Sequence, residues 1–411
     1  MKITFLLTQD VTSPSGLGRY FPWAKELVRL GHEVSVIALH SDFANLPERK
    51  LFISGVSVEY VGQMHVKKQG SKKSYFSPTA LIWVALKATY KLFRAALAKP
   101  VDVLLVGKPH PMNSLAALLV KAINRKVRLI VDCDDDEASS NRFNNQLQRQ
   151  IVAWFERWVP KKAQIVTSNT YFTLNRLEVS GVPRKKLVYV PNGIDEERFG
   201  HIDPENVEEL RNRLGLQGKK VISYIGSMSL PSHPIDLLLK AFALVKENLA
   251  DATLMLVGGG EDLENLMVLA AELSINDRTL FVGRVHPDEV AYYYALSHVS
   301  VDPVYDDDSA RGRCPLKLFE SWACGVPFIT SSVGDRAHLA GDPPAAVLVE
   351  AGNAESLAKG ITKILEDHSL GKSLQGAGFR QFKNYSWSYI TKKNGWVFFP
   401  GEIFSKVNLV N

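Results

Sequence analysis

Lys317 and Glu320 lie three positions apart in a short segment that carries most of the chemically useful groups of this sequence. The segment reads RGRCPLKLFESWACGVP from Arg311, and its proline and glycine suit the start and the end of a helix over 315–324. Lys317 and Glu320 would share one face of that helix. Free backbone N–H groups and the guanidinium groups of Arg311 and Arg313 would meet at its start, which suits a phosphate, while a carboxylate suits sugar or ribose hydroxyls. The alternative is a surface helix with a solvated Lys–Glu pair.

The composition is that of a folded protein with anionic partners. The chain has 411 residues, of which 46% are hydrophobic and 22% charged, which is enough for two domains with their own cores. Its formal charge of +6 favours nucleotides, phospholipid surfaces or nucleic acid as partners. The cysteines form no Cys-x-x-Cys pair, which argues against a disulfide framework or a zinc ribbon and fits a reducing cytosol. Asp10 ends the first apolar run before a signal sequence develops, and no uncharged apolar stretch could span a bilayer, so we expect a soluble or peripheral protein.

Apolar runs of strand length alternate with helical stretches in two successive series. The first series lies at 2–7, 33–39, 56–61, 102–106, 127–132, 164–167 and 187–190, and the second at 221–226, 252–257, 279–282, 299–302, 326–330 and 346–349. Several runs are apolar at successive positions, as in parallel strands buried on both faces. We therefore expect an α/β fold of two doubly wound, Rossmann-like domains, 1–195 and 196–385, divided at a Pro-Asn-Gly turn. A C-terminal helix near 386–411 is expected to pack back on the first domain.

Three segments of the first domain follow predicted strands and should face a ligand, because open α/β sheets bind ligands at the carboxyl ends of their strands. The first segment, 13–19, has two glycines and an arginine before a helix, which suits an anion or an acceptor but also a plain strand–helix turn. The second segment, 107–111, contains a lysine and a histidine. The third is an acidic run over 132–137, which is either solvated or needs basic partners or a metal. The candidate residues are Gly16, Gly18, Arg19, Lys108, His110, Asp134 and Asp135.

The segment 66–100 combines basic and apolar residues in a pattern that suits a membrane surface. It opens with lysines at 67, 68, 72 and 73, and it continues as a helix on which Lys87, Lys91 and Arg94 share a face. Apolar and aromatic residues fill much of the remaining helix surface, and a second basic aromatic stretch covers 148–162. Such a helix can lie on an anionic membrane. The alternative is a domain helix that packs on its sheet and shows a charged outer face.

Several motifs carry a resemblance to a known family. They include LVRLGHEVSVIAL, VPNGID, LMLVGGGEDLENL, FVGRV and PLKLFESWACGVPFITS, and they cover nearly the whole chain. The chain resembles the retaining, nucleotide-sugar-dependent glycosyltransferases of family 4 (group 1), whose GT-B fold has two Rossmann-like domains facing across a cleft. The resemblance implies that the second domain binds the nucleotide sugar and that the first, with Gly16, Gly18, Arg19, Lys108 and His110, binds the acceptor. It also implies that Glu320 binds the ribose hydroxyls, and that the donor is further bound by Gly226, Ser227, His233, Gly283, Arg284, Val285 and Leu316.

The second domain departs from the family's pattern at two places. Gly312 stands where the family often has the first glutamate of a Glu-x7-Glu motif, and an aspartate of 306–308 could replace that carboxylate. Ser227 and His233 stand where the family's arginine and lysine clamp the diphosphate. A leaving diphosphate still needs positive charge. We therefore assign that charge to Arg311, Arg313 and Lys317.

The first domain departs from the pattern as well, since the acidic run replaces a histidine that the family frequently has after its fifth strand. Asp134 or Asp135 would then be the base that hydrogen-bonds the acceptor hydroxyl. In this family the leaving phosphate is thought to help deprotonate the acceptor during same-face attack. That reaction needs neither a protein nucleophile nor a divalent metal, so we expect no metal site and no cofactor besides the nucleotide-sugar substrate.

The resulting prediction is a transferase that moves a sugar from a nucleotide-diphosphate sugar to a glycan or a lipid-linked acceptor, in envelope or exported polysaccharide synthesis. We expect it in the cytoplasm or on the inner face of the cytoplasmic membrane, in contact with an anionic surface. Two alternatives stay open, a GT-B protein that only binds a nucleotide sugar and a sugar-nucleotide epimerase. A phosphorylase would carry a pyridoxal lysine, for which no marker is present. Nucleic-acid binding is the weakest reading, because the basic residues are scattered and no recognition motif occurs.

Overall fold

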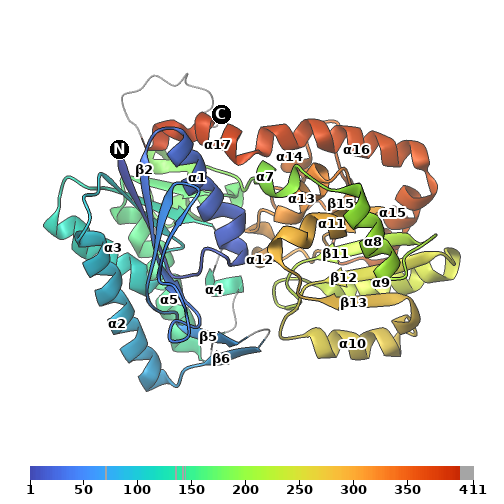
Figure 1. The fold of residues 1–411 in the computed structure, drawn as a ribbon, viewed down its shortest axis with the longest axis horizontal. Coiled ribbons are helices and arrows are strands. Elements are labelled where there is room, and N and C mark those ends of the chain that lie inside the picture. Colours follow the sequence, from blue (N-terminus) through green and yellow to red (C-terminus); the bar gives the residue numbers. More distant parts are fainter. Residues whose placement is uncertain (70–71, 135–136, 141–142, 144, 399–411) are drawn as a thin grey trace. The chain divides into compact units, whose positions relative to one another are not determined.

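The structure, a computed structural model, describes residues 1–69, 72–134, 137–140, 143 and 145–398. It divides into two compact units, of which the first comprises Met1–Asn192 with the segment from Trp387, and the second comprises Gly193–Ser386 (Figure 1). Each unit is built on its own sheet, and each is described by itself below.

Within the described residues, the sheet of the first unit has eight strands. Their order is β10 (Leu187–Tyr189), β9 (Ile165–Ser168), β8 (Arg128–Cys133), β7 (Val103–Gly107), β1 (Lys2–Leu7), β2 (Glu33–His40), β4 (Val56–Gln63) and β3 (Lys50–Ile53). Neighbouring strands are parallel except β3, which pairs antiparallel with β4. The seven apolar runs predicted for this domain correspond to the seven parallel strands. The order of β1, β2 and β7 places a topological switch point between β1 and β7.

Helices cover both faces of this sheet, which explains why its strands are apolar at successive positions. On one face Phe5 of β1 packs in a core with Trp23 of α1 (Phe21–Arg29) and Trp387 of α17 (Trp387–Asn394). The next residue, Leu6, belongs to the opposite core. That second core is closed by α2 (Pro78–Leu97), α3 (Pro111–Ile123), α5 (Gln146–Lys162) and α6 (Tyr171–Val179).

The sequence reading missed the short elements of the first unit. The lysine run forms an antiparallel hairpin of β5 (Val66–Gln69) and β6 (Lys72–Tyr75), and the edge strand β3 also went unpredicted. These strands are short and rich in polar residues, so they lack the continuous apolar run of a buried parallel strand. A π-helix at Gly16–Tyr20 precedes α1, and the short α4 (Glu137–Ser140) begins at the last residue of the acidic run.

The second unit has, among the described residues, a six-stranded parallel sheet. Its order is β13 (Thr279–Gly283), β12 (Ala252–Val257), β11 (Lys220–Ile225), β14 (Val299–Val301), β15 (Phe328–Ser331) and β16 (Val347–Val349). This is the Rossmann order, with the switch point between β11 and β14. All six predicted runs correspond to these strands.

Two helical layers cover the second sheet. One core contains residues of α9 (Ile235–Asn248), α10 (Leu263–Glu272), α15 (Ala354–Glu366) and α16 (His368–Phe382). The other contains residues of α7 (Glu196–Phe199), α8 (Pro204–Arg213), α11 (Val290–Ala295), α13 (Leu316–Ala323) and α14 (Arg336–Ala340), while α12 (Asp308–Arg311) precedes α13. The predicted helix over 315–324 is thus α13, with Pro315 at the cap position just before it rather than inside its first turn.

Helix α2 is the helix that the sequence predicts either to lie on an anionic membrane surface or to pack as an ordinary domain helix. Across the ranges that the structure describes, no helix combines the length and the apolarity needed to cross a bilayer.

Candidate functional site

The switch point of the second sheet gathers buried charges around Asp302, the residue that follows β14. Asp302 is buried, and its Oδ2 accepts hydrogen bonds from Nε and Nη2 of Arg336 at 3.1 and 3.0 Å. Its Oδ1 lies 3.6 Å from Nζ of Lys317. Burial alone would raise the pKa of Asp302, but Arg336 and Lys317 lower it, so the carboxylate is ionised. Asp302 therefore holds two cations at the carboxyl end of the sheet, and sequence reasoning assigned neither Asp302 nor Arg336.

Lys317 lies at the centre of this charge cluster. Its ammonium is buried and lies 4.9 Å from the ring centre of Tyr224, the penultimate residue of β11. A Cβ atom at Gly226 would lie 2.9 Å from Cε of Lys317, so a side chain at this position would clash with the lysine in its present position. Burial and the nearby Arg313 lower the pKa of Lys317, while Asp302 opposes that shift. Lys317 is thus a poorly solvated cation, and such a cation interacts strongly with an incoming anion.

Glu320 follows Lys317 on the same helix and is partly buried. Its Oε2 accepts a hydrogen bond from the Tyr294 hydroxyl at 2.9 Å. Burial raises the pKa of Glu320, while Arg198, the Tyr294 bond and Lys317 lower it. The electrostatic influence of Lys317 and Glu320 on each other agrees with the shared helix face expected from their spacing.

The remaining cations predicted at this helix differ in their surroundings. Arg313 is half-buried and donates from Nη2 to Oγ of Ser309 at 2.9 Å, and its charge lowers the pKa of Lys317. Arg311 is exposed and pairs with Asp306 at 2.7 Å, the surface arrangement that competes with a role toward a ligand. The role of Arg313 and Arg311 in donor binding stays a prediction, and the geometry favours Arg313.

His233 and Ser227 lie near the same charges without adding to them. Burial, with Lys317 and Arg313, holds the pKa of His233 well below its usual range, so the imidazole is neutral at pH 7. Ser227 is exposed, and its carbonyl accepts a hydrogen bond from the Tyr224 hydroxyl at 2.8 Å. Neither residue replaces the clamp cations, as the sequence indicated.

The other residues predicted to bind the donor also lie in the second unit. Gly283 ends β13, and its carbonyl accepts a hydrogen bond from the N–H of Gly258 at 2.8 Å. Arg284 is exposed, Val285 is partly exposed, and Leu316 is the first residue of α13. Their contact with a base stays a prediction.

In the first unit, the segment predicted as either an anion or acceptor loop or a plain strand–helix turn contains a largely buried π-helix at Gly16–Tyr20. A Cβ at Gly16 would lie 2.3 Å from the carbonyl oxygen of Val11, and Gly18 accepts a hydrogen bond from Nε1 of Trp387 at 3.0 Å. Arg19 is 1% exposed and makes a two-point ion pair with Asp132, at 2.8 and 2.6 Å. Tight backbone packing and a buried ion pair thus involve these three residues, and their role in acceptor binding stays a prediction.

A second group of charges follows β7 and β8 of the same unit. Nζ of Lys108 lies 2.7 Å from Oε1 of Glu137 and 3.6 Å from Oδ2 of Asp134. Nε2 of His110 lies 3.3 Å from Oε2 of Glu137. Although burial raises the pKa of Glu137, Lys108 and His110 lower it far below its usual range. Lys108 has a φ of 54°, a conformation that a non-glycine residue adopts only when its surroundings demand it.

Asp134 is buried in this group, and its Oδ1 accepts a hydrogen bond from Asn169 at 2.7 Å. Its neighbour Asp135 lies outside the described residues. The structure thus brings Asp134, Lys108 and His110 together, as expected for residues at adjacent strand ends, and it adds Glu137 and Asn169. The role of Asp134 as a base stays a prediction.

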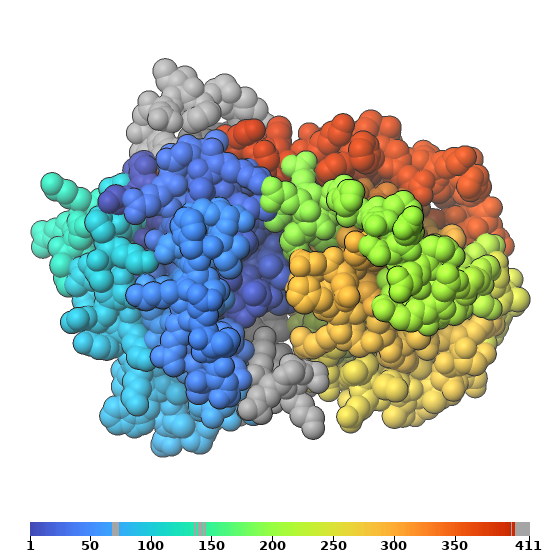
Figure 2. Space-filling view, viewed as in Figure 1, coloured from blue at the N-terminus to red at the C-terminus, as the bar shows by residue number. Residues whose placement is uncertain are grey.

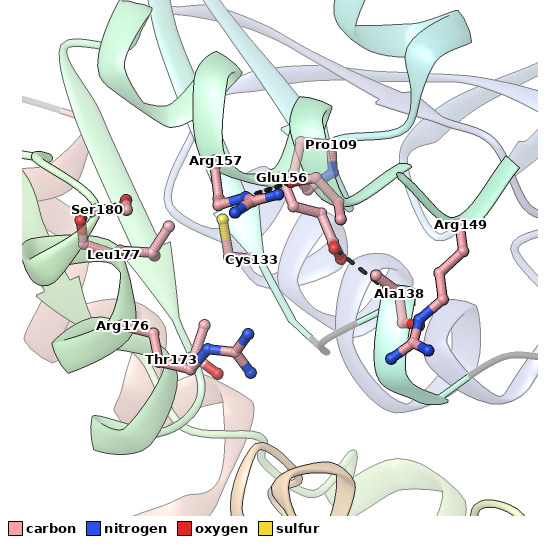
Figure 3. A pocket seen from close by; sticks show the side chains of 11 residues that line it. Pro109, Cys133, Ala138, Arg149, Glu156, Arg157, Thr173, Arg176, Leu177 and Ser180 are labelled. Carbon is pink, nitrogen blue, oxygen red and sulfur yellow. Dashed lines mark hydrogen bonds between the residues drawn. The ribbon is translucent and has the colours of Figure 1, made fainter. Parts of the chain in front are cut away.

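A pocket of about 230 Å³ lies beside this group and is lined by α5 and α6 (Figure 3). Three arginines border it, namely Arg149, Arg157 and Arg176. Glu156 is its acidic lining residue, and its carboxylate accepts from the backbone N–H groups of Glu137 and Ala138. Cations therefore outnumber anions among the residues that line this pocket.

Among the described residues, no group of three or more histidine, cysteine, aspartate or glutamate side chains is arranged to hold a metal ion.

Comparisons with known proteins match both units. The family model for "Glycosyl transferases group 1" matches residues 206–380, and the model for "Glycosyltransferase Family 4" matches residues 21–198. The first match contains Lys317 and Glu320, and the second contains Lys108 and Asp134.

Two curated proteins illustrate the sequence similarity. A GDP-mannose-dependent alpha-(1-6)-phosphatidylinositol monomannoside mannosyltransferase of Mycolicibacterium smegmatis is 24% identical over 57% of this chain and 62% of its own length. An N-acetyl-alpha-D-glucosaminyl L-malate synthase of Bacillus anthracis is 24% identical over 72% of this chain and 74% of its own. The chain thus spans less than two thirds of the length of the mannosyltransferases it matches.

Solved structures show the similarity of fold. Sucrose-phosphate synthase from Thermosynechococcus elongatus has a TM-score of 0.75 at 18% identity, over 97% of this chain and 98% of its own. Anabaena Alr3699/HepE in complex with UDP-glucose has a TM-score of 0.73 at 18% identity, over 97% of this chain and 99% of its own. These neighbours are GT-B glycosyltransferases, so the predicted GT-B fold is confirmed.

Proposed function

We propose that this chain, which belongs to the group 1 glycosyl transferases with the GT-B fold, moves a sugar from a nucleotide-diphosphate sugar to a hydroxyl group of a glycan or a lipid-linked acceptor. The observation that carries the proposal is the charge cluster at the switch point of the second sheet. There Lys317 is held by Asp302, and Glu320 lies one helical turn away. A buried cation suits a diphosphate, and a carboxylate suits the ribose hydroxyls.

The proposed reaction breaks the bond between the anomeric carbon and the diphosphate oxygen. The electron pair of that bond leaves with the nucleoside diphosphate, whose growing negative charge is stabilised by Lys317 and Arg313. The acceptor oxygen forms the new bond on the same face of the sugar, so the configuration is retained, and its proton passes to the leaving phosphate. Asp134 would orient the acceptor hydroxyl. Neither a protein nucleophile, a metal nor a further cofactor enters this scheme.

The acceptor is proposed to belong to envelope or exported polysaccharide synthesis and to lie at an anionic membrane surface on the cytoplasmic side. The relatives support this choice, because the mycobacterial enzymes act by name on a phosphatidylinositol mannoside. The basic character of the first unit points in the same direction.

The donor can be identified by thermal shift with GDP-mannose, UDP-glucose and other nucleotide sugars. A ligand at one hundred times its dissociation constant stabilises the folded state by about 2.7 kcal/mol, which is measurable as a higher melting temperature. We expect one nucleotide class to stabilise the protein and a matching acceptor to cause release of nucleoside diphosphate. Stabilisation without release for any glycan or lipid-linked acceptor would instead support a binding protein without transfer.

Replacing Glu320 by glutamine should weaken nucleoside diphosphate binding by tenfold or more, because a hydrogen bond to a charged group contributes about 1.5–3 kcal/mol. Calorimetric titration of the nucleoside diphosphate measures this loss. The matched control is Glu355→Gln, an exposed glutamate at the start of α15. Equal affinities for the wild type and Glu320→Gln would remove Glu320 from ribose binding.

A further inference from the structure

Three neighbouring helices of the first unit leave an apolar surface uncovered. Trp83 of α2, Ile123 of α3 and Leu147 of α5 are 66%, 62% and 64% exposed. Other large apolar side chains on these helices are also exposed. The whole set, here called the three-helix face, is Ile82, Trp83, Leu86, Tyr90, Leu97, Leu115, Leu119, Ile123, Leu147, Ile151 and Trp154.

Packing of the domain does not account for these residues, because each helix already buries another apolar face. On α5 the side chains of Phe155 and Val159 belong to the second core of the unit, and Val152 is also buried. Leu147, Ile151 and Trp154 recur at spacings of four and three, so they form a separate stripe on the same helix. On α3, Leu115, Leu119 and Ile123 form the same kind of stripe at spacings of four. A surface helix normally has one apolar stripe, which packs on the core. A second stripe that is exposed indicates an interaction site.

The three stripes belong to one side of the unit. Helix α3 packs against α2 and against α5, and all three helices contribute to the same core on one face of the sheet. Figure 1 shows α2 and α3 side by side, and in Figure 2 their blue-green segment lies at the surface of the molecule. The apolar side chains therefore form an extended surface rather than isolated contacts.

Charges around the face identify the kind of partner. The sequences of α2 and α3 contain no aspartate or glutamate, and exposed cations of α2 are Lys87, Lys91 and Arg94. Helix α5 adds Arg149, Arg157, Lys161 and Lys162, whereas its one acid, Glu156, accepts hydrogen bonds from backbone N–H groups. An apolar stripe flanked by cations complements a bilayer surface, whose interior is apolar and whose anionic headgroups lie above it.

A second copy of the chain fits this surface less well. A symmetric pair would bring the same patch of both copies together, so the cations of one α2 would meet those of the other. Such like-charge contacts are costly, whereas anionic lipids neutralise each cation. Exposed tryptophan and tyrosine also favour the bilayer, since both are enriched at the boundary between headgroups and acyl chains.

We propose that the three-helix face binds an anionic lipid bilayer, with the apolar stripes of α2, α3 and α5 at the acyl boundary and their cations among the headgroups. The proposal names the surface through which the enzyme would reach a membrane-bound acceptor, and in that sense it rests on the proposed function. Binding itself needs no donor, no acceptor and no turnover.

The test is sedimentation with vesicles of phosphatidylcholine, with and without phosphatidylglycerol. The wild type should bind the anionic vesicles and be released by high salt, because salt screens the headgroup charges. The variant Lys87→Gln/Lys91→Gln/Arg94→Gln should bind about 100-fold more weakly, from about a factor of five for each cation. The variant Trp83→Ser/Leu86→Ser/Trp154→Ser should also lose binding, without a change in charge.

The matched control replaces exposed apolar residues elsewhere, as Val179→Ser/Met267→Ser/Phe379→Ser, and should bind as the wild type does. Circular dichroism checks that all variants fold. Failure of the wild type to bind anionic vesicles, or unchanged binding by both three-helix-face variants, would overturn the proposal. A wild-type dimer in sedimentation equilibrium that the serine variant abolishes would also overturn it, because the face would then join two copies. Sugar transfer to a soluble acceptor without detergent is measured in parallel. A wild type that transfers sugar but does not bind vesicles refutes only the proposed lipid-binding surface. A wild type that binds vesicles but transfers no sugar refutes only the proposed function.

Discussion

Replacing Lys317 by alanine should lower turnover by about 100- to 1,000-fold, the range found when one preorganised donor to a developing charge is removed. Donor affinity should fall much less. Lys317 is buried and held by Asp302 at 3.6 Å, so it does not need to reorganise when the glycosidic bond breaks. Negative charge on the diphosphate increases during that step, and the contact therefore strengthens in the transition state.

Steady-state kinetics with the donor identified by thermal shift measure the two quantities separately. Lys363→Ala is the matched control, because Lys363 is an exposed lysine of α15 in the same unit. Arg313→Ala should show the same pattern as Lys317→Ala, since Arg313 is half-buried and affects the pKa of Lys317. A rise in the Michaelis constant with normal turnover in both variants would mean that these cations bind ground state and transition state equally.

The main features of both sheets could be predicted because they follow from local patterns. Parallel strands buried on both faces favour continuous apolar runs, and several of the predicted segments have such a run. All thirteen parallel strands of the described chain coincide with predicted apolar segments. Strands β5 and β6 carried no such signal, because their sequences VKKQ and KKSY consist mainly of polar residues. Their lysines therefore indicate a charged surface and give no sign of a strand.

The charged groups of the candidate site could be predicted only in part. Lys317 and Glu320 were found because both lie on one short helix with recognisable ends. Their partners come from distant positions: Asp302 pairs with Arg336 across 34 residues, and Tyr294 reaches Glu320 across 26. Such pairs form when strand ends and helices meet in space, and no spacing rule predicts them. Arg19 is a similar case, because the carboxylate that it pairs with, Asp132, lies 113 residues away.

Arg19→Met should lower the free energy of unfolding by about 3–5 kcal/mol, because removing one partner of a buried ion pair leaves the other charge uncompensated. Arg19 and Asp132 are 1% and 0% exposed at their side chains. The guanidinium also donates to the carbonyl of Val190 and to Oδ1 of Asn192, at 3.0 and 2.9 Å, and lies over the rings of Trp23 and Trp387. One side chain thus joins β8, the segment after β10, α1 and α17.

The loss of stability should appear in the first unit. Amide hydrogen exchange measures it, because the amides of β8 should exchange faster in the variant while those of the second unit should not. Arg184→Met is the control, because Arg184 makes an ion pair with Glu178 at 2.8 Å in the same unit while 46% of its side chain is exposed. That substitution should cost less than about 1 kcal/mol.

The double variant Arg19→Met/Asp132→Asn removes the buried carboxylate charge and should regain part of the stability that Arg19→Met loses. If the double variant is as unstable as the sum of the two single variants, the pair is not coupled, and packing of the arginine against Trp23 and Trp387 carries the effect instead.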